Sequence, residues 1–269
     1  MVYKIYICIS IYTYIYMKIL PLLYSALMQY NDGIAKRNFQ LAAATYCNAD
    51  KINSWDCVHC LPEITIQDAI IGDTNIIIAN DPVQNATVFA FRGSVDIQNW
   101  ISNFEFEFTS PYPDPAIKVH KGLHKEYLKY KDTLFRYLPE SDAKVVITGH
   151  SSGAALSMFM AYDIYKSYDV SVYTFGKPRI GNSVFVESAK PIQHYRITHH
   201  NDIVPHVPEE LLGYRHTDTE IWYYDDGDKY KVCEGNEDSE CSNSCAPIHC
   251  DSISDHLYYM GTNIGSDYC

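Results

Sequence analysis

A strand-like run, a glycine–serine turn and a helix-like run follow one another without a linker between residues 144 and 166. Lys144–Thr148 is largely β-branched, which is typical of a strand buried on both faces. The sequence Gly-His-Ser-Ser-Gly occupies residues 149–153, and apolar residues then recur at helical spacing from Ala154 to Lys166. A buried strand that turns directly into a helix is a building unit of parallel sheets, so this segment strongly constrains the fold.

The remaining segments extend this unit into an α/β fold. The chain adds predicted helices at 30–46 and 119–138, predicted strands at Thr74–Asn80, Ala86–Phe91, Val170–Phe175 and Gln193–His199, and a loop-like tail at Asp225–Cys250. Strands that alternate with helices predict a mostly parallel central sheet with helices on both faces. The length of 269 residues suits one such domain, which we place at residues 27–269.

Ser151 lies at the centre of the glycine–serine turn. A G-x-S-x-G pattern between a strand and a helix is typical of a nucleophile elbow, in which a strained backbone exposes the serine hydroxyl. The N–H of the next residue, Ser152, and the positive end of the helix then face any negative charge that develops there. The bare pattern also occurs by chance in turns of small residues. The flanking strand and helix are the context that the chemistry requires, and they favour Ser151 as a nucleophile.

A serine nucleophile needs a base and an acid that orients the base, expected later in the chain with the acid first. Asp202 follows the predicted strand that ends at His199, so it lies at the same edge of a parallel sheet as Ser151. The rival acids, all in polar loop sequence, are Asp218, Asp225, Asp226 and Asp228. The candidate bases are His206, His216, His249 and His256. His256 begins an apolar segment and is favoured, but the residues alone leave the other histidines open.

Residues 1–26 predict a secretory signal peptide. Apolar runs follow Lys4 and Lys18, and small residues close the segment. Tyr24 gives a poor cleavage signal, and translation from Met17 would produce a shorter signal with the same end. The alternative is a retained membrane anchor. Each apolar run is, however, shorter than the roughly 20 residues that a spanning helix needs.

Eight cysteines follow the predicted signal, an even number that is typical of disulfides formed in an oxidising compartment. They are Cys47, Cys57, Cys60, Cys233, Cys241, Cys245, Cys250 and Cys269. A zinc site is the alternative, because Cys57 and Cys60 have the spacing of half a zinc site, but no second pair matches it. We therefore expect disulfides, no metal, and a secreted, extracellular protein. Asn85-Ala86-Thr87, a glycosylation acceptor sequence, is consistent with export.

The net charge of −12 limits the partners of this chain. An acidic surface repels phosphates, so we expect no nucleic-acid binding. Strongly anionic lipid surfaces would repel it as well, whereas neutral fat and zwitterionic lipid would not. Nothing in the sequence indicates a cofactor or an obligate protein partner.

At these residues the chain resembles the secreted fungal class 3 lipases of the Rhizomucor miehei lipase type. The resemblance runs from about residue 33 to Cys269 and rests on several separate segments. The similar segments are Thr45–Cys47, Trp55–Cys60, Phe91–Ser94, Asn99–Ile101, Lys118–Gly122, Phe175–Asn182, Asn201–Pro205 and Asp255–Leu257. The resemblance implies an α/β-hydrolase fold and a serine esterase that acts on glyceride esters at a lipid–water interface without a cofactor.

The resemblance also implies the roles of individual residues. The positions of the family's catalytic triad are occupied by Ser151, Asp202 and His256. Ser94 matches the serine of the oxyanion hole, which contributes a backbone N–H and a hydroxyl, and Ser152 matches the second N–H donor. Three positions depart from the family pattern: Ser152 replaces a leucine, Ala154 replaces a glycine, and Asn103 replaces an aspartate that supports the oxyanion serine. The amide oxygen of Asn103 can still accept that hydrogen bond. None of the three changes removes a member of the triad, so we expect activity.

The cysteine pairing follows from the same resemblance. It implies the pairs Cys47–Cys269, Cys57–Cys60 and Cys233–Cys241. Cys245 and Cys250 are extra to the family pattern, and we expect them to pair with each other.

An apolar stripe follows Ser94 at the helical spacing i, i+3, i+4, i+7, and its members are Ile97, Trp100, Ile101 and Phe104. On an ordinary helix such a stripe packs on the core. Directly after the oxyanion loop, the resemblance implies a lid that opens at a lipid surface. The sequence thus predicts a secreted triacylglycerol lipase. A phospholipase A1 and a feruloyl esterase are alternatives on the same fold, although Trp100 disfavours the second, and a non-catalytic binding protein is disfavoured by the intact triad.

Overall fold

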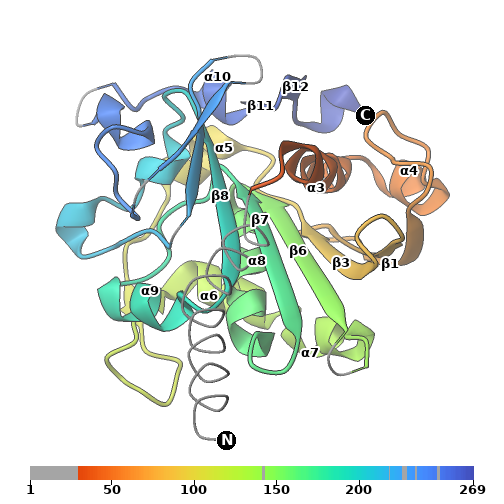
Figure 1. Ribbon diagram of the computed structural model, residues 1–269, viewed down its shortest axis with the longest axis horizontal. Coiled ribbons are helices and arrows are strands. Elements are labelled where there is room, and N and C mark those ends of the chain that lie inside the picture. The colour runs from red at the N-terminus through yellow and green to blue at the C-terminus, as the bar shows by residue number, and fades with distance from the viewer. Residues whose placement is uncertain (1–29, 141–142, 218, 226–228, 234, 247–248) are drawn as a thin grey trace, which may run out of the picture. The chain divides into compact units, whose positions relative to one another are not determined.

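The computed structural model describes residues 30–269 apart from 141–142, 218, 226–228, 234 and 247–248 (Figure 1). The chain divides into two compact units, Met1–Ala35 and Lys36–Cys269, and the second contains the sheet and all predicted site residues. The predicted signal peptide, residues 1–26, lies outside the described residues. Among the residues that are described, no helix is long and apolar enough to cross a membrane.

An eight-stranded sheet forms the centre of the second unit, in the order β1-β2-β3-β6-β7-β8-β9-β10. Its strands are β1 (Thr65–Ile70), β2 (Ile76–Asp81), β3 (Ala86–Phe91), β6 (Lys144–His150), β7 (Asp169–Phe175), β8 (Gln193–His199), β9 (Glu220–Tyr223) and β10 (Tyr230–Val232). Neighbours from β3 to β9 pair in parallel, whereas β1, β2 and β10 join the two ends of the sheet antiparallel. Figure 1 shows β8, β7, β6, β3 and β1 side by side in this order. The predicted α/β fold with a mostly parallel sheet is confirmed.

Helices and short strand pairs complete the fold. The helices are α3 (Asp32–Ala44), α4 (Ala49–Ser54), α5 (Ile97–Ser102), α6 (Lys121–Leu128), α7 (Lys131–Leu134), α8 (Ser152–Ile164), α9 (Ser183–Ala189) and α10 (Ile253–His256). The short strands are β4 (Phe108–Thr109) with β5 (Val119–His120), and β11 (Tyr258–Tyr259) with β12 (Thr262–Asn263). Single 3₁₀ turns are η2 (Phe135–Tyr137), η3 (Val204–His206), η4 (Glu210–Leu212), η5 (Ser242–Cys245) and η6 (Ser266–Tyr268).

Helix α8 packs against one face of the sheet because it is apolar nearly all round. Residues Gly153–Ala161 and Ile164 are buried, as expected for a helix at the centre of a core. Phe89 of β3 and Ile147 of β6 join α8 in one apolar cluster. Because successive residues of a strand point to opposite faces, the strand residues next to Phe89 and Ile147 in the sequence point to the other face of the sheet. Ser151 thus sits between two thoroughly buried elements, β6 and α8.

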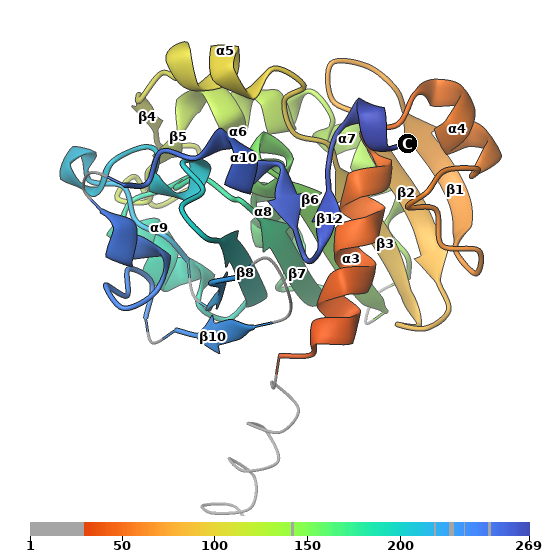
Figure 2. The same ribbon diagram turned by 90° about the horizontal axis from the view of Figure 1, so that it is seen from above.

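The opposite face of the sheet is covered by the C-terminal segment and by α3 from Lys36 onward. The rings of Phe39 in α3 and Phe175 in β7 meet edge to face with centroids 5.0 Å apart. Tyr259 of β11 lies beside Phe39, with ring centroids 6.2 Å apart. Figure 2 shows β12 next to α3, although the two are far apart in the sequence. This packing brings the C-terminal segment, which contains His256, over the sheet edge where Ser151 lies.

Four disulfides occur among the described residues. They join Cys47 to Cys269, Cys57 to Cys60, Cys233 to Cys241 and Cys245 to Cys250. The first three are the pairs that the family resemblance implies, and the fourth joins the two extra cysteines. Cys57 and Cys60 are bonded to each other, as the disulfide interpretation predicts and the zinc alternative does not.

Two predicted segments differ from the structure. Residues 119–138 do not form one helix: Val119–His120 pairs as a strand with β4, and α6, α7 and η2 follow separately. The His120 ring nitrogen Nδ1 accepts a hydrogen bond from the Leu123 N–H at 3.2 Å, so His120 caps α6 and the helix starts two residues later than predicted. The predicted loop at 225–250 contains β10, a partly exposed edge strand of three residues that is too short to show an alternating pattern.

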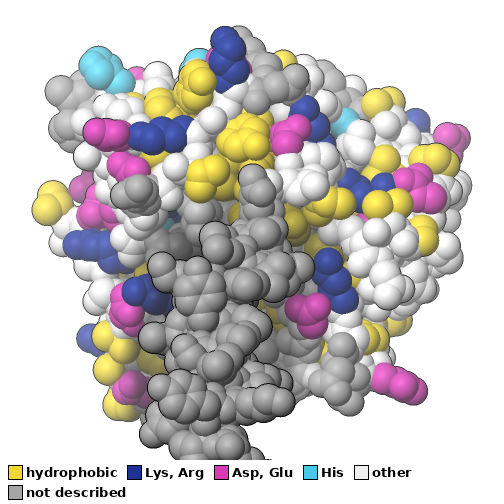
Figure 3. Space-filling view, in the orientation of Figure 1, with side chains coloured by type: hydrophobic (Ala, Val, Ile, Leu, Met, Phe, Trp, Pro, Cys, Tyr) yellow, Lys and Arg dark blue, Asp and Glu magenta, His cyan; other side chains and the backbone are white. Residues whose placement is uncertain are grey.

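The face drawn in Figure 3 carries both acidic and basic side chains, interspersed rather than separated by sign. Several ion pairs occur in the described parts of the chain, for example Lys131 with Asp163 at 2.7 Å. The excess of negative charge is therefore not gathered into a single acidic patch on this face.

Candidate active site

Ser151 occupies a strained turn between β6 and α8. Its backbone has φ 58° and ψ −131°, a conformation that side-chain-bearing residues rarely adopt. The turn is tight because Gly153 lies against β3, where a Cβ would come within 2.4 Å of the Phe91 carbonyl oxygen. The second glycine of G-x-S-x-G is thus required by close packing of the helix on the sheet. Ser151 is buried, and its N–H donates to the Phe175 carbonyl at 2.9 Å.

His256 and Asp202 form a buried pair beside this turn. The Asp202 carboxylate oxygens lie 3.0 and 2.9 Å from His256 Nδ1. The same carboxylate accepts hydrogen bonds from the Val204 N–H, at 2.8 Å, and from the Tyr259 hydroxyl. Burial alone would raise the pKa of Asp202, but His256 and these donors together hold that pKa below its usual value. Asp202 is therefore charged at neutral pH and fixes the orientation of the His256 ring.

Gly176 makes room for this pair. It has φ 57°, and a Cβ there would lie 2.8 Å from Asp202 Oδ2 and from two atoms of the His256 ring. Gly176 directly follows Phe175, whose carbonyl accepts from Ser151. The acid, the histidine and the serine therefore meet at the C-terminal ends of β6, β7 and β8, the edge where parallel α/β sheets bind ligands.

Two atoms at the site have no partner. Ser151 Oγ and His256 Nε2 are both buried, and neither has a hydrogen bond to any described residue. Unpartnered buried polar atoms are rare and costly in folded proteins. Here they are the hydroxyl that a nucleophile would use and the nitrogen that would take its proton.

A chain of hydrogen bonds joins His256 to the loop that contains Ser94. The His150 ring lies over the His256 ring, with centroids 4.4 Å apart, and its Nε2 is 2.8 Å from the His256 carbonyl oxygen. His150 Nδ1 is 2.7 Å from the Tyr46 hydroxyl, which also accepts the Gly93 N–H at 3.1 Å. Burial and the neighbouring His256 lower the pKa of His150 to about 3, so the ring is neutral. A neutral ring that donates through Nε2 must accept from Tyr46 at Nδ1.

The side chains of Ser94 and Ser152 are in contact. Ser94 lies in the loop after β3, Ser152 is the first residue of α8, and their hydroxyl oxygens are 3.2 Å apart. The side chain of Asn103 does not support Ser94: it is exposed, and its Nδ2 donates to the Asn99 carbonyl at 2.8 Å. The expectation that the Asn103 amide oxygen supports Ser94 is thus not met, because the amide is turned back onto its own helix.

The comparisons with known proteins agree on one family. A sequence model of the family described as lipase (class 3) matches residues 88–212. The lipase of Rhizomucor miehei is 34% identical to this chain, and the alignment covers 84% of this chain and 67% of that protein. The chain belongs to the class 3 lipase family.

Solved structures of class 3 lipases share the fold. Lipase II from Rhizopus niveus superposes with a TM-score of 0.79 at 30% identity, over 87% of this chain and 96% of that one. The Rhizomucor miehei triacylglyceride lipase gives a TM-score of 0.78 at 32% identity over the same shares. The chain spans 62% of the length of another relative it matches, a lipase of Rhizopus niveus. The α/β-hydrolase fold implied by the resemblance is thus confirmed.

A cavity of 360 Å³ in this class 3 lipase opens beside the two serines. Ser94 and Ser152 line it together with Leu156 of α8 and with Trp100 and Phe104 from the segment around α5. The Trp100 and Phe104 rings are in contact, with centroids 4.2 Å apart. Of the predicted stripe, these two rings therefore border the site, whereas Ile97 is buried and Ile101 is half-buried.

The other candidate acids and bases take different places. His216 Nε2 contacts the Pro205 carbonyl, Asp225 pairs with Lys229, and His249 is exposed. Asp218, Asp226 and Asp228 lie outside the described residues. Of the four candidate histidines, His256 is the one hydrogen-bonded to Asp202.

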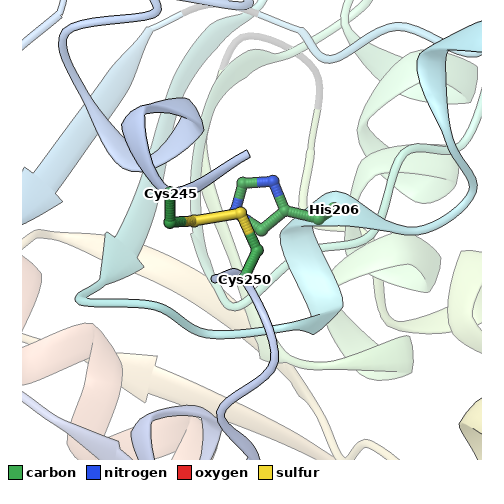
Figure 4. Close-up of side chains that lie close together, drawn as sticks. All are labelled: His206, Cys245 and Cys250. Carbon is green, nitrogen blue, oxygen red and sulfur yellow. A yellow bond between two sulfur atoms is a disulfide. The ribbon is translucent and has the colours of Figure 1, made fainter. Parts of the chain in front are cut away.

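His206 contacts a disulfide instead of the site. Figure 4 shows its ring against the Cys245–Cys250 bond, with Nε2 3.6 Å from Cys245 Sγ. These three side chains are close enough to share a metal ion, but both sulfurs are bonded to each other and neither is a thiolate. The disulfide therefore leaves the cluster without the sulfur ligands that a metal would need.

Sequence reasoning missed four residues that shape the site. Gly176 lay inside a segment chosen for its resemblance, and its position just after a predicted strand end was an available signal. His150 is part of the G-x-S-x-G pattern, but nothing in the pattern shows what its ring contacts. Tyr46 and Tyr259 reach the site from opposite ends of the chain, so no local spacing could have identified them.

Proposed function

We propose that this chain is a secreted lipase that hydrolyses the esters of triacylglycerols through a serine acyl-enzyme. The observation that carries the proposal is the pair of buried, unpartnered atoms, Ser151 Oγ and His256 Nε2, with Asp202 fixing the histidine. Among the solved structures, a chain 31% identical over 87% of this one is described as a triacylglycerol lipase whose catalytic centre is a serine protease triad.

The proposed reaction begins with proton transfer. His256 Nε2 accepts the proton of Ser151 as Oγ attacks the ester carbonyl, and the charged Asp202 stabilises the resulting imidazolium. The carbonyl oxygen becomes negative and faces the N–H groups of Ser94 and Ser152 and the Ser94 hydroxyl. His256 returns the proton to the departing glyceride alcohol. Water then attacks the acyl-enzyme by the same steps and releases the fatty acid.

We assign α5 as a lid for this site. The helix has six residues, with its start capped by the Asp96 side chain, which accepts from the Asn99 N–H at 3.0 Å. Trp100 and Phe104 cover the cavity beside Ser94, while Val95, just before the helix, is 75% exposed. Outward rotation would uncover the cavity and present the rings to a lipid surface, as in other lids that gate an active site.

Secretion is part of the proposal. Four disulfides among the described residues suit an oxidising compartment. The relative from Fusarium solani, 29% identical over 76% of this chain, is named a secreted mono- and diacylglycerol lipase. We place the protein outside the cell, with a neutral or zwitterionic lipid surface as its partner.

A substrate panel tests the proposal. Purified protein is assayed on emulsified tri-, di- and monoacylglycerols, on phosphatidylcholine vesicles and on a feruloyl ester, beside Ser151→Ala. We expect hydrolysis of triacylglycerol that rises sharply above the solubility limit and is lost in the variant. Hydrolysis of only partial glycerides, phospholipid or the feruloyl ester would assign a different substrate to the same site. Retained activity in Ser151→Ala would contradict the mechanism.

A further inference from the structure

Ser152 brings a hydroxyl into the oxyanion region, where the family resemblance implies a leucine. Its backbone N–H has a role in the proposed mechanism, but its side chain has none. The Ser152 hydroxyl lies 3.2 Å from the Ser94 hydroxyl. Neither hydroxyl has another hydrogen bond to the described residues, so each depends on the other.

The cavity around the two serines has a mixed lining. Both serines are half-buried and border it together with apolar Leu156 and Trp100 and with polar residues such as Glu105, but no other described polar residue of the lining hydrogen-bonds to either serine hydroxyl. The Asn103 side chain, the other possible support for Ser94, donates its Nδ2 hydrogen to the Asn99 carbonyl of α5 instead. The contact also links two separate elements, since Ser94 belongs to the loop after β3 and Ser152 begins α8.

A serine hydroxyl has one hydrogen to donate and can accept two hydrogen bonds. When Ser152 donates to Ser94 Oγ, the Ser94 hydrogen stays free to point at the oxyanion. Accepting this bond also polarises the Ser94 hydroxyl and makes it a stronger donor. Without Ser152, the Ser94 hydroxyl can rotate among staggered positions, only some of which face the oxyanion.

We propose that the Ser152 side chain is a positioning residue that holds the Ser94 hydroxyl toward the oxyanion. The proposal rests on the esterase function proposed above. It predicts that the Ser152 hydroxyl raises kcat by acting on the Ser94 hydroxyl. The effect of Ser152 on kcat should therefore disappear when Ser94 has no hydroxyl.

A double-mutant cycle on a soluble ester tests this coupling. The kcat and KM for p-nitrophenyl butyrate are measured for the full chain, Ser152→Ala, Ser94→Ala, the double variant and Ser152→Thr, which keeps a hydroxyl. All variants keep the backbone N–H of residue 152. Ser54→Ala removes a hydroxyl at the exposed end of α4 and serves as the matched control, and thermal unfolding checks that each variant is folded.

We expect Ser152→Ala to lower kcat about fivefold to tenfold, the effect of one neutral hydrogen bond, with KM unchanged. Ser152→Thr should recover most of the loss. In the Ser94→Ala background, removing the Ser152 hydroxyl should change kcat less than about twofold, because coupled groups are not additive.

Three results would overturn the inference alone. The first is an unchanged kcat in Ser152→Ala, and the second is the same fold loss with and without the Ser94 hydroxyl. The third is a Ser152→Thr variant as slow as Ser152→Ala, which would place the effect in packing rather than in the hydroxyl. An absence of ester hydrolysis in the unmodified chain is a different outcome. It would contradict the proposed function, and this inference with it.

Discussion

Tyr46 and His150 connect the loop before Ser94 to His256, two parts of the site that are far apart in the sequence. Tyr46 accepts from Gly93, in the loop that leads to Ser94, and contacts His150, which in turn holds the His256 backbone. All these groups are buried, and burial raises the pKa of Tyr46 well above its usual range. The bridge is therefore uncharged at any pH where the protein works, and its strength comes from satisfied hydrogen bonds in a dry environment.

Removing the hydroxyl of Tyr46 tests this bridge. Tyr46→Phe leaves the Gly93 N–H and His150 Nδ1 without a partner, which costs about 1–3 kcal/mol for a buried group. We expect a loss of stability in this range and a kcat lowered about tenfold, because the oxyanion loop and His256 lose their common support. Denaturant unfolding measures the loss of stability, and ester hydrolysis measures kcat.

Tyr162→Phe is the matched control for that variant. It also removes a tyrosine hydroxyl with a 2.8 Å hydrogen bond, in this case to Ser188, outside the site. The control should lose some stability but keep kcat. If the two variants have the same kcat, the bridge does not support the reaction.

At the scale of elements, α5 differs from the helices around it. Helix α8 is buried on nearly every side, whereas α5 has six residues, of which Ile97 alone is buried. Elements with few buried contacts open most readily, and mobile lids belong to this class. Trp100 and Phe104 are partly buried against the apolar core, and the lid proposal requires both rings to leave it when α5 moves.

Trp100→Ala tests the role of α5 at a lipid surface. Trp100 borders the cavity and carries much of the apolar surface that would meet lipid. We expect activity on emulsified triacylglycerol to fall about tenfold, with a much smaller change on a soluble ester. Gln98→Ala, an exposed position on the same helix, is the control and should change neither rate. Equal losses on both substrates would place Trp100 in the reaction rather than in the response to lipid.

Prediction from sequence succeeded where local pattern decides the structure. The segment before Ser151 is a short β-branched run and the segment after it is a longer apolar run, so residue type, length and the glycine turn between them identified both elements. It failed at 119–138, where pairing of β5 with β4 and the His120 cap override the apolar pattern. The candidate site divides in the same way: Ser151 follows from its context, His256 needed the family resemblance, and Tyr46 needed the folded chain.

At the scale of the whole molecule, buried titratable groups link stability to pH. Burial lowers the pKa of His120 to about 4, and burial together with His256 lowers that of His150 to about 3. For Asp81, burial alone would raise the pKa, but hydrogen bonds from Arg37 hold it below its usual value. In each case the unfolded chain binds protons at a higher pH than the folded chain does.

Because the unfolded chain binds these protons at a higher pH, we expect the free energy of unfolding to fall on acidification. Both histidines titrate near pH 6.5 when unfolded, so each should contribute a loss of about 1–2 kcal/mol between pH 6.5 and pH 5, with a further loss below about pH 4 as Asp81 is protonated. Denaturant unfolding from pH 8 to pH 3 measures this loss of stability. His120→Asn keeps a cap acceptor for α6 but cannot titrate, so its stability should fall less steeply. A flat profile between pH 7 and pH 5 would contradict this account.

The central claim, that Ser151 is the activated nucleophile, is tested most directly by covalent labelling. Diethyl p-nitrophenyl phosphate transfers its phosphoryl group to an activated serine and releases p-nitrophenolate, and fragmentation of the labelled peptide separates Ser151 from Ser152. We predict one adduct, on Ser151, formed on the order of 10³-fold more slowly in His256→Ala. An adduct on another residue, or hydrolysis of esters by a protein whose Ser151 stays unlabelled, would contradict the claim.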